Sequence, residues 1–318
     1  MNKPKVAIAI PTFNRDYCID KAIDAALNQS YDNISVIIVD DGSSDGTYDC
    51  VSPYFDKPNF NYIQLDKNVG TARAKNVALM FSEYDAISFH DSDDLPDPNK
   101  IMLQVRALQQ KGHVADEILN WQLMGHEPGS SLGIDVVVGA HKMIKLDGSV
   151  HHIAKRMSLV DDFFPNLQFP SKTEGDWILI NSGLFRKEVF EELGGYLDSV
   201  EEDREIRNRL IGTGKMFYFI EYPLLTKIEM EVSLTVSEDT GYRANRRLND
   251  RNEVWRRLKA IRQAEDIPAL KKELAEKVDL SDVGFKFVSN PDMLTFNKHI
   301  PHVAGSDAAL KPVLQKSA

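Results

Sequence analysis

The chain has 318 residues, of which 42% are hydrophobic and 27% are charged, and its formal charge at pH 7 is −10. This length and balance predict a globular protein with one large domain, or one domain and an extension. The net negative charge argues against nucleic acid as the main partner, because proteins that bind polyphosphate backbones usually present a basic face. Small phosphate ligands remain compatible with it, since a metal ion or a local arginine can neutralise them.

The cysteine content and the hydropathy pattern indicate where the protein works. Cys18 and Cys50 are the only cysteines, and neither lies in a CxxC pair or a zinc-ligand spacing. The apolar run at 6–10 is too short for the core of a signal peptide. No run of about 18 apolar residues could span a membrane. We therefore expect a protein of the cytoplasm, where thiols stay reduced, with peripheral association at the inner face of the membrane as an open alternative.

The first hundred residues alternate between buried strands and helices. Strands are predicted at 6–10, 34–39, 62–65 and 85–89, and helices from 19, from about 44, over 69–81 and over 98–110. This alternation implies a parallel sheet with right-handed crossovers. In such sheets ligands bind beyond the carboxyl ends of the strands. Polar clusters follow each strand, so we expect them to converge in one crevice; they lie at 11–15, 40–44, 68–70 and 91–94.

The rest of the chain is less regular. A hairpin is predicted around Asp147-Gly148, since Asp-Gly is a strong turn signal. Beyond it we predict strands at 177–185 and 216–220, with helices at 187–193 and 203–211. A basic helix is expected over 243–262 and another over 264–280. No periodic pattern is visible from about 281 onward.

Asp91, Asp93 and Asp94 lie within four residues, directly after the apolar run 86–89. Clustered carboxylates repel one another, and near pH 7 they are tolerated where a divalent cation or water screens them. Mg²⁺ and Mn²⁺ favour oxygen ligands, commonly one or two carboxylates together with substrate phosphates. The segment predicts a site where a metal meets a phosphorylated substrate, and the alternative is a solvated acidic turn. The expected convergence of the strand ends favours the metal.

A second acidic cluster is formed by Glu201, Glu202 and Asp203, more than a hundred residues further along. A carboxylate there could act as a general base. Acidic residues at the start of a helix are also favoured by the helix macrodipole alone, so both interpretations stay open at this point.

Taken in order, five segments of the chain resemble the family 2 glycosyltransferases. They are 11–15, 39–43, 68–70 with Lys75-Asn76, 91–94, and Glu202-Asp203 leading into a helix through Leu210. The resemblance covers roughly residues 4–235 and implies a GT-A fold: an α/β domain with a Rossmann-like, mostly parallel central sheet and flanking helices. It implies a nucleotide-binding half at 1–111 and an acceptor-binding, catalytic half at 112–235. A helical, partly basic C-terminal extension would follow at 236–318.

The activity implied by the resemblance is transfer of a sugar from a UDP-sugar to a glycan or lipid-linked glycan acceptor, with inversion at the anomeric carbon. The enzyme would be a metal-dependent hexosyl- or N-acetylhexosaminyltransferase acting in surface polysaccharide or glycoconjugate synthesis. It would be non-processive, because the QxxRW motif of processive relatives is absent. Two alternatives share the fold. A sugar nucleotidyltransferase is disfavoured by the lack of a Gly-rich loop after the first strand, and a non-catalytic nucleotide-sugar-binding module by the intact acidic residues.

Carried over position by position, the resemblance implies that Pro11 and Asp41 contact the uracil and that Arg15 lies near the base or the diphosphate. Asp91 would contact ribose or sugar hydroxyls. Asp203 would be the general base. The metal, Mn²⁺ or Mg²⁺, would be bound by Asp93 with Asp94. Further contacts are predicted to the nucleotide from Thr12, Asn14, Asp40, Lys75 and Ser92, and to the sugar or acceptor from Asn181, Ser182, Gly183 and Glu202.

The chain departs from the family pattern at one expected ligand. Relatives often carry a His shortly before a Ser-Leu-Thr segment, whereas Met230 precedes Ser233-Leu234-Thr235 in this chain. That extra metal or phosphate ligand is therefore in doubt. We interpret 233–247 as a loop that closes over the diphosphate, with an arginine from Arg243, Arg246 or Arg247 as a phosphate clamp.

Overall fold

The computed structural model describes residues 3–113, 131–153, 180–230, 240–241 and 244–304. These residues form two compact units that interleave along the chain. The first unit holds 3–102, 184–198 and 275–304, and the second holds the described residues between 103 and 183 and between 199 and 274. The predicted domain limits after residues 111 and 235 remain predictions.

The first unit is built on a twisted sheet whose strands follow the order β12-β3-β2-β1-β4-β10. Strands β1, β2, β3 and β4 are parallel, as the alternating sequence pattern predicts, while β10 and β12 run antiparallel to β4 and β3. The strands are β1 (Val6–Thr12), β2 (Ile34–Asp40), β3 (Phe60–Leu65), β4 (Ala86–Phe89), β10 (Leu184–Arg186) and β12 (Phe285–Ser289), with the short β5 (Leu95–Pro96) in the loop after β4.

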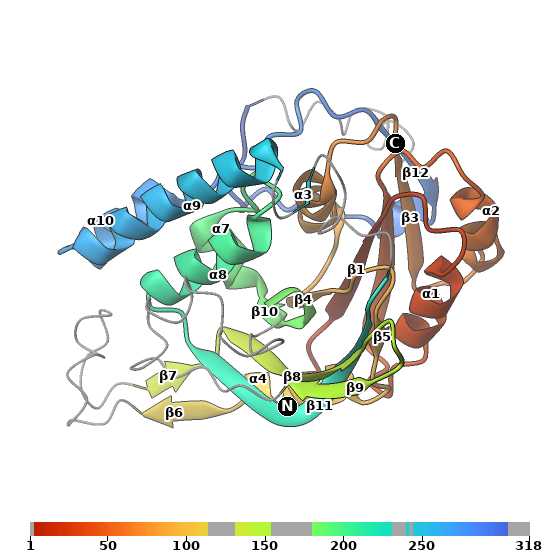
Figure 1. Ribbon diagram of the computed structural model, residues 1–318, viewed down its shortest axis with the longest axis horizontal. Coiled ribbons are helices and arrows are strands. Elements are labelled where there is room, and N and C mark those ends of the chain that lie inside the picture. The colour runs from red at the N-terminus through yellow and green to blue at the C-terminus, as the bar shows by residue number, and fades with distance from the viewer. Residues whose placement is uncertain (1–2, 114–130, 154–179, 231–239, 242–243, 305–318) are drawn as a thin grey trace. The chain divides into compact units, whose positions relative to one another are not determined.

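Helices cover both faces of this sheet, because its central strands carry apolar residues on both faces. Every residue of β1 and β2 is buried. In Figure 1, α3 lies on one side of these strands, and α1 and α2 lie on the other. The helical elements are α1 (Ile19–Leu27), α2 (Thr47–Val51), η1 (Ser52–Tyr54), α3 (Thr71–Phe81), α7 (Lys187–Leu193) and η3 (Pro291–Met293).

The second unit contains β8 paired in parallel with β11 and antiparallel with β9, and a separate antiparallel pair, β6 and β7. The predicted hairpin is confirmed, with Gly148 in its turn at a φ of 80°. The strands are β6 (Lys111–His113), β7 (Ser131–Gly133), β8 (Val136–Ile144), β9 (Val150–Ile153) and β11 (Phe217–Ile228). The helices are α4 (Lys100–Leu108, which begins in the first unit), η2 (Ile180–Ser182), α8 (Glu202–Gly212), α9 (Asn245–Gln263) and α10 (Ile267–Leu274).

Two predicted elements are wrong. The strand expected over 177–185 is, in its described part, the single turn η2 followed by β10. The turn is closed by the Gly183 amide donating to the Ile180 carbonyl at 2.9 Å, since Asn-Ser-Gly favours a turn over a strand. The helix expected over 264–280 ends at Leu274, because the following residues form backbone hydrogen bonds with the end of α7.

That return of the chain depends on a glycine. Gly194 has a φ of 76°, and a Cβ there would lie 1.8 Å from the Glu276 carbonyl oxygen, so only glycine fits. Residues 275–304 then continue within the first unit and add β12 to its sheet. Within the described ranges, no helix is long and apolar enough to cross a bilayer.

Candidate active site

The polar loops that follow β1 and β2 are joined to each other by hydrogen bonds. Thr12 and Asp40, the last residues of the two strands, are register partners. Beyond them, the Asn14 amide donates to Ser43 Oγ and the Ser44 amide donates to Asn14 Oδ1, both at 2.9 Å. Asn14 adopts a left-handed φ of 52°, a conformation that Asn tolerates better than most residues. These contacts hold two of the predicted nucleotide-binding segments together at one edge of the sheet.

Asp41 joins a third polar loop to the same place. Its Oδ1 accepts the Val69 amide at 2.7 Å and its Oδ2 accepts the Gly70 amide at 2.9 Å, directly before α3. Burial raises the pKa of Asp41 to about 6, although the two backbone donors act in the opposite direction. Gly42 follows with a φ of 74°, where a Cβ would lie 2.6 Å from the Lys67 carbonyl carbon. The side chain is therefore fixed, and its proton is held more tightly than that of an exposed aspartate.

Asp40 is fully buried and has partners of its own within the first unit. Its Oδ1 accepts the Ser43 amide at 2.9 Å, and its Oδ2 accepts the Tyr62 hydroxyl. The Tyr62 ring packs edge-on against Tyr48 and lies beside Phe55. These contacts show that Asp40 supports the loop. Its predicted contact with the nucleotide remains a prediction.

The acidic loop after β4 is the fourth polar segment at this edge. The Arg15 guanidinium lies 4.0 Å from Asp93 Oδ2, and the Cys18 thiol donates to the Ser92 carbonyl at 3.5 Å. Burial, and then the Asp93 carboxylate, raises the pKa of Cys18 to about 11, so the thiol stays protonated at neutral pH. All four polar clusters that follow the parallel strands therefore meet within the first unit.

Exposure separates the acidic residues of this loop into two kinds. Asp91 and Asp93 are partly exposed, whereas Ser92 and Asp94 are buried. No group of three or more His, Cys, Asp or Glu side chains able to hold a metal occurs among the residues that the structure describes. Oxygen donors from one or two carboxylates still fit Mg²⁺ or Mn²⁺, because such sites are completed by phosphate and water oxygens. Asp93 is the more accessible of the two predicted ligands.

A buried polar group that was not predicted from the sequence lies next to Ser88 and His90, just before the acidic loop. Lys100 is fully buried, and its Nζ donates to Ser88 Oγ at 2.7 Å and lies 3.1 Å from His90 Nε2. Burial lowers the pKa of Lys100 well below its usual value, and burial together with Lys100 lowers the pKa of His90. His90 thus points into the protein. A lysine at the first position of an amphipathic helix gives no sequence signal of such burial.

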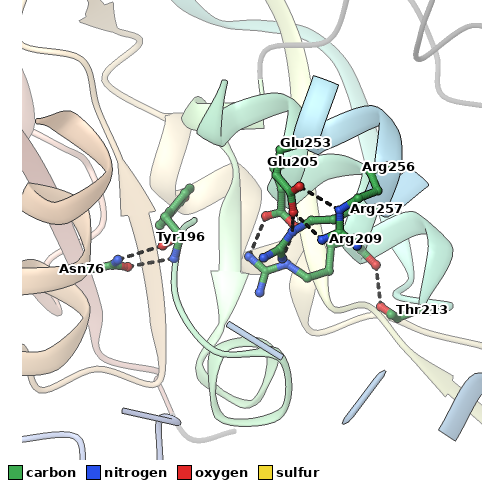
Figure 2. A network of polar contacts seen from close by, with 8 residues as sticks. All are labelled: Asn76, Tyr196, Glu205, Arg209, Thr213, Glu253, Arg256 and Arg257. Carbon is green, nitrogen blue, oxygen red and sulfur yellow. Dashed lines mark hydrogen bonds and ion pairs between the residues drawn. The ribbon is translucent and has the colours of Figure 1, made fainter. Parts of the chain in front are cut away.

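Lys75 is also fully buried, on α3. Its Nζ lies 5.0 Å from the centre of the Tyr196 ring, a cation–π distance. The neighbouring Asn76 binds the backbone of Tyr196 at both ends: its Nδ2 donates to the Tyr196 carbonyl at 2.9 Å, and its Oδ1 accepts the Tyr196 amide at 2.8 Å (Figure 2). The Lys75-Asn76 pair therefore fastens the segment after α7, and a contact of Lys75 with the nucleotide remains a prediction.

Asp203, the predicted base, lies in the first turn of α8 in the second unit. Its Oδ2 accepts a hydrogen bond from Asn181 Nδ2 at 2.5 Å, and Asn181 belongs to the turn η2. The neighbouring Ser182 is buried, and its carbonyl accepts the Gln104 amide at 3.1 Å. Three of the residues predicted to bind sugar or acceptor, Asn181, Ser182 and Glu202, are thus buried side chains around the start of α8.

Glu201, one residue before α8, is the centre of a set of ion pairs. Its Oε1 accepts Arg247 Nη1 at 3.0 Å and Arg251 Nη2 at 2.9 Å, and its Oε2 lies 3.0 Å from Arg204 Nε. Helix α9 also provides Asp250, whose Oδ2 accepts the Val200 amide at 2.8 Å. Arg247 is therefore committed to Glu201 and is a poor candidate for a phosphate clamp. Arg246 is exposed, and Arg243 lies outside the described residues, as does 231–239.

Comparisons with known proteins bear on the family and the fold of this chain. The model of the family "Glycosyl transferase family 2" matches residues 7–164. An uncharacterized glycosyltransferase of Haemophilus influenzae is 34% identical over 111 residues, which are 35% of this chain and 44% of that protein. A Bacillus subtilis glycosyltransferase named for teichuronic acid biosynthesis, TuaG, is 35% identical over 112 residues, which are 34% of this chain and 44% of that protein. The match thus spans less than half of each of these two relatives.

Similarity of fold extends further than similarity of sequence. The structure of residues 1–349 of TarS from S. aureus, in complex with UDP-GlcNAc, aligns with a TM-score of 0.56 at 18% identity. The alignment covers 85% of this chain and 70% of that one. At this identity it speaks for the fold, which is GT-A: a mixed sheet with helices on its faces. Through residues 7–164, the chain belongs to glycosyltransferase family 2.

Proposed function

We propose that the protein transfers a sugar from a UDP-sugar to a hydroxyl group of a glycan acceptor, with inversion and with the help of a divalent metal. The observation that carries this proposal is the meeting of four polar loops at one edge of the first unit's sheet, with Asp41, Arg15 and Asp93 among them. Family membership and the named role of TuaG support a part in polysaccharide synthesis. The location, in the cytoplasm or at the inner face of the membrane, remains a prediction.

In this mechanism the residues of the first unit bind the donor. Asp41 would accept a hydrogen bond from the uracil, Pro11 would pack against it, and Asp91 would bind ribose or sugar hydroxyls. Asp93, with Asp94, would hold the metal, which when bound would stabilise the negative charge that develops on the leaving diphosphate. Arg15 would lie close enough to that charge to support it.

The chemical step needs a base as well as a leaving group. The acceptor oxygen forms a bond to the anomeric carbon while the bond from that carbon to the diphosphate oxygen breaks, which inverts the configuration. Asp203 would take the proton of the attacking hydroxyl, and UDP leaves with the bonding electrons.

The metal assignment can be tested by binding alone. We expect UDP to bind in the presence of Mn²⁺ and to bind at least about tenfold more weakly when EDTA removes it. The Asp93→Asn variant should lose most of this metal dependence and should bind Mn²⁺ poorly, as measured by electron paramagnetic resonance. Asp97→Asn, which changes an aspartate beyond the acidic loop, serves as the control. Equal Mn²⁺ binding by the wild type and by Asp93→Asn would contradict the assignment.

The raised pKa of Asp41 predicts a pH dependence of donor binding. Below about pH 6 the carboxyl is protonated, so a charge-assisted hydrogen bond to the uracil is lost. We expect affinity for a UDP-sugar to fall by up to about tenfold between pH 7 and pH 5. A UDP-sugar is the right probe because its diphosphate, esterified at both ends, has no group that titrates near pH 6. Calorimetric titration of the Asp41→Asn variant should show a flat profile over this range, and a flat wild-type profile would refute the prediction.

Ionisation of Asp41, which would favour donor binding, has the opposite effect on the stability of the fold. Its pKa in the folded protein, about 6, lies above the ordinary value of 3.8, so the folded state binds more protons in between. The contribution of Asp41 to the free energy of unfolding therefore falls as pH rises from about 4 to about 6. Its ionisation at neutral pH is a cost to the fold, of the kind often found at binding sites.

A further inference from the structure

The contact between Asn181 and Asp203 joins two elements of the second unit that are separated in sequence. Asn181 lies in the single turn η2, is buried, and directs its Nδ2 to Asp203 Oδ2 at 2.5 Å. The turn is linked to β8 by Gln104. The Nε2 of Gln104 donates to the Ser182 carbonyl at 3.1 Å and to the Val137 carbonyl at 3.0 Å. A side-chain amide on a rigid turn is thus aimed at the carboxylate.

Such a contact restricts a carboxylate. It limits rotation about χ2, because one oxygen accepts a hydrogen bond from a turn that is itself hydrogen-bonded to Gln104. A defined orientation serves a general base, which must face the acceptor hydroxyl before the proton is transferred.

Other charged groups around the start of α8 act on the same carboxylate. Arg207, one turn further along α8, interacts electrostatically with Asp203. Arg204 is paired with Glu201, which also holds Arg247 and Arg251 of α9. The negative charge of Glu201 is therefore offset by its own arginines. Glu202 is a like charge directly beside Asp203 in the sequence.

We propose that Asn181 is a positioning residue for Asp203, holding its carboxylate in one orientation. This inference rests on the proposed function, in which Asp203 is the base. It gives Asn181 a task separate from the acceptor contact predicted for it.

The test compares Asn181→Ala and Asn181→Gln with the wild type, using kcat, KM for the donor and the melting temperature. For Asn181→Ala we expect kcat at pH 7 to fall about tenfold, with the donor KM changed less than about twofold. Asn181→Gln keeps an N–H donor on a longer side chain and should recover part of the lost turnover.

The control is Asn208→Ala on α8, the helix that carries Asp203. Asn208 is buried like Asn181, and its side-chain amide atoms have no hydrogen-bond partner in the described part of the chain, so the same truncation occurs without touching Asp203. It should leave kcat unchanged.

Three results would count against these assignments, and they are distinct. An unchanged kcat in Asn181→Ala overturns the positioning role. A lower kcat that Asn181→Gln does not raise, together with a lower melting temperature, shows a merely structural role and also overturns it. Full activity of Asp203→Asn overturns the base assignment itself, whatever the Asn181 variants show.

Discussion

Replacing Asp203 by Asn is expected to lower kcat by about 10²–10⁴-fold while the donor KM changes little. The substitution keeps the size of the side chain, and the amide oxygen of the new residue can still accept from Asn181. An amide cannot take the proton of an acceptor hydroxyl, however, so only the chemical step should suffer. The measurement is steady-state turnover, scored as release of UDP in the presence of an acceptor.

Glu188 provides the matched control for this variant. Like Asp203 it is an acidic residue in the first turn of a helix, α7, and it is exposed. If Asp203 were placed only to satisfy a helix macrodipole, Asp203→Asn and Glu188→Gln would both leave turnover close to that of the wild type. A turnover of Asp203→Asn within about threefold of the wild type would therefore favour the structural explanation.

Replacing Arg209 by Met is expected to reduce the free energy of unfolding by about 3–5 kcal/mol. Arg209 is fully buried in α8, and its Nη2 donates to Glu205 Oε2 at 2.9 Å (Figure 2). Glu205 is buried too, and its second partner is Arg257 Nη1 of α9 at 3.3 Å. Among the residues that the structure describes, removing Arg209 leaves the buried Glu205 carboxylate with the longer contact to Arg257 as its one remaining ion pair. Urea denaturation followed by circular dichroism measures the loss.

A double variant separates the ion pair from the packing. Glu205→Leu combined with Arg209→Met removes both charges and keeps the volume apolar, so most of the lost stability should return. Arg257 would keep its other partner, Glu253, at 3.3 Å. The control is Arg256→Ala, an exposed arginine that contacts the same Glu253, and it should not shift the urea midpoint measurably. A double variant as unstable as Arg209→Met would refute this account of the buried pair.

The elements predicted best are those with a clear pattern of apolar and polar residues in the sequence. Strands buried on both faces, such as β1 and β2, are apolar over most of their length, and each is followed by a polar loop and then by a helical repeat. The parallel order of these strands then brings the loops at 11–15, 40–44, 68–70 and 91–94 together without further information. This is why the meeting of these four loops at one edge of the first unit's sheet could be anticipated from the sequence.

Elsewhere the deciding interactions are non-local. The segment around Asn181 looks apolar enough for a strand, but the Asn-Ser-Gly sequence folds as a turn. Strand β12 was not predicted, although Phe285 and Phe287 alternate with Lys286 in a strand-like pattern; it is fixed by pairing with β3, more than two hundred residues earlier. A short alternation of this kind is too weak a signal on its own.

The candidate site was also predicted only in part. Clusters of acidic residues can be recognised in the sequence, but whether each side chain is buried or exposed cannot. Asp40 and Lys75 belong to segments that resemble the family, yet the structure shows both as buried residues with structural partners. Lys100 carries no sequence signal at all, because its burial depends on the Ser88 and His90 side chains of a distant strand and loop.

Sugar transfer from a UDP-sugar by general-base catalysis can be measured with a panel of nucleotide sugars. The wild type and Asp203→Asn are each incubated with these donors, Mn²⁺ and glycan acceptors, and the released nucleoside diphosphate is quantified. We expect the wild type to release UDP from at least one UDP-sugar and Asp203→Asn to release almost none. If the wild type neither turns over nor binds any UDP-sugar, or if both proteins release UDP equally, the proposed function is wrong.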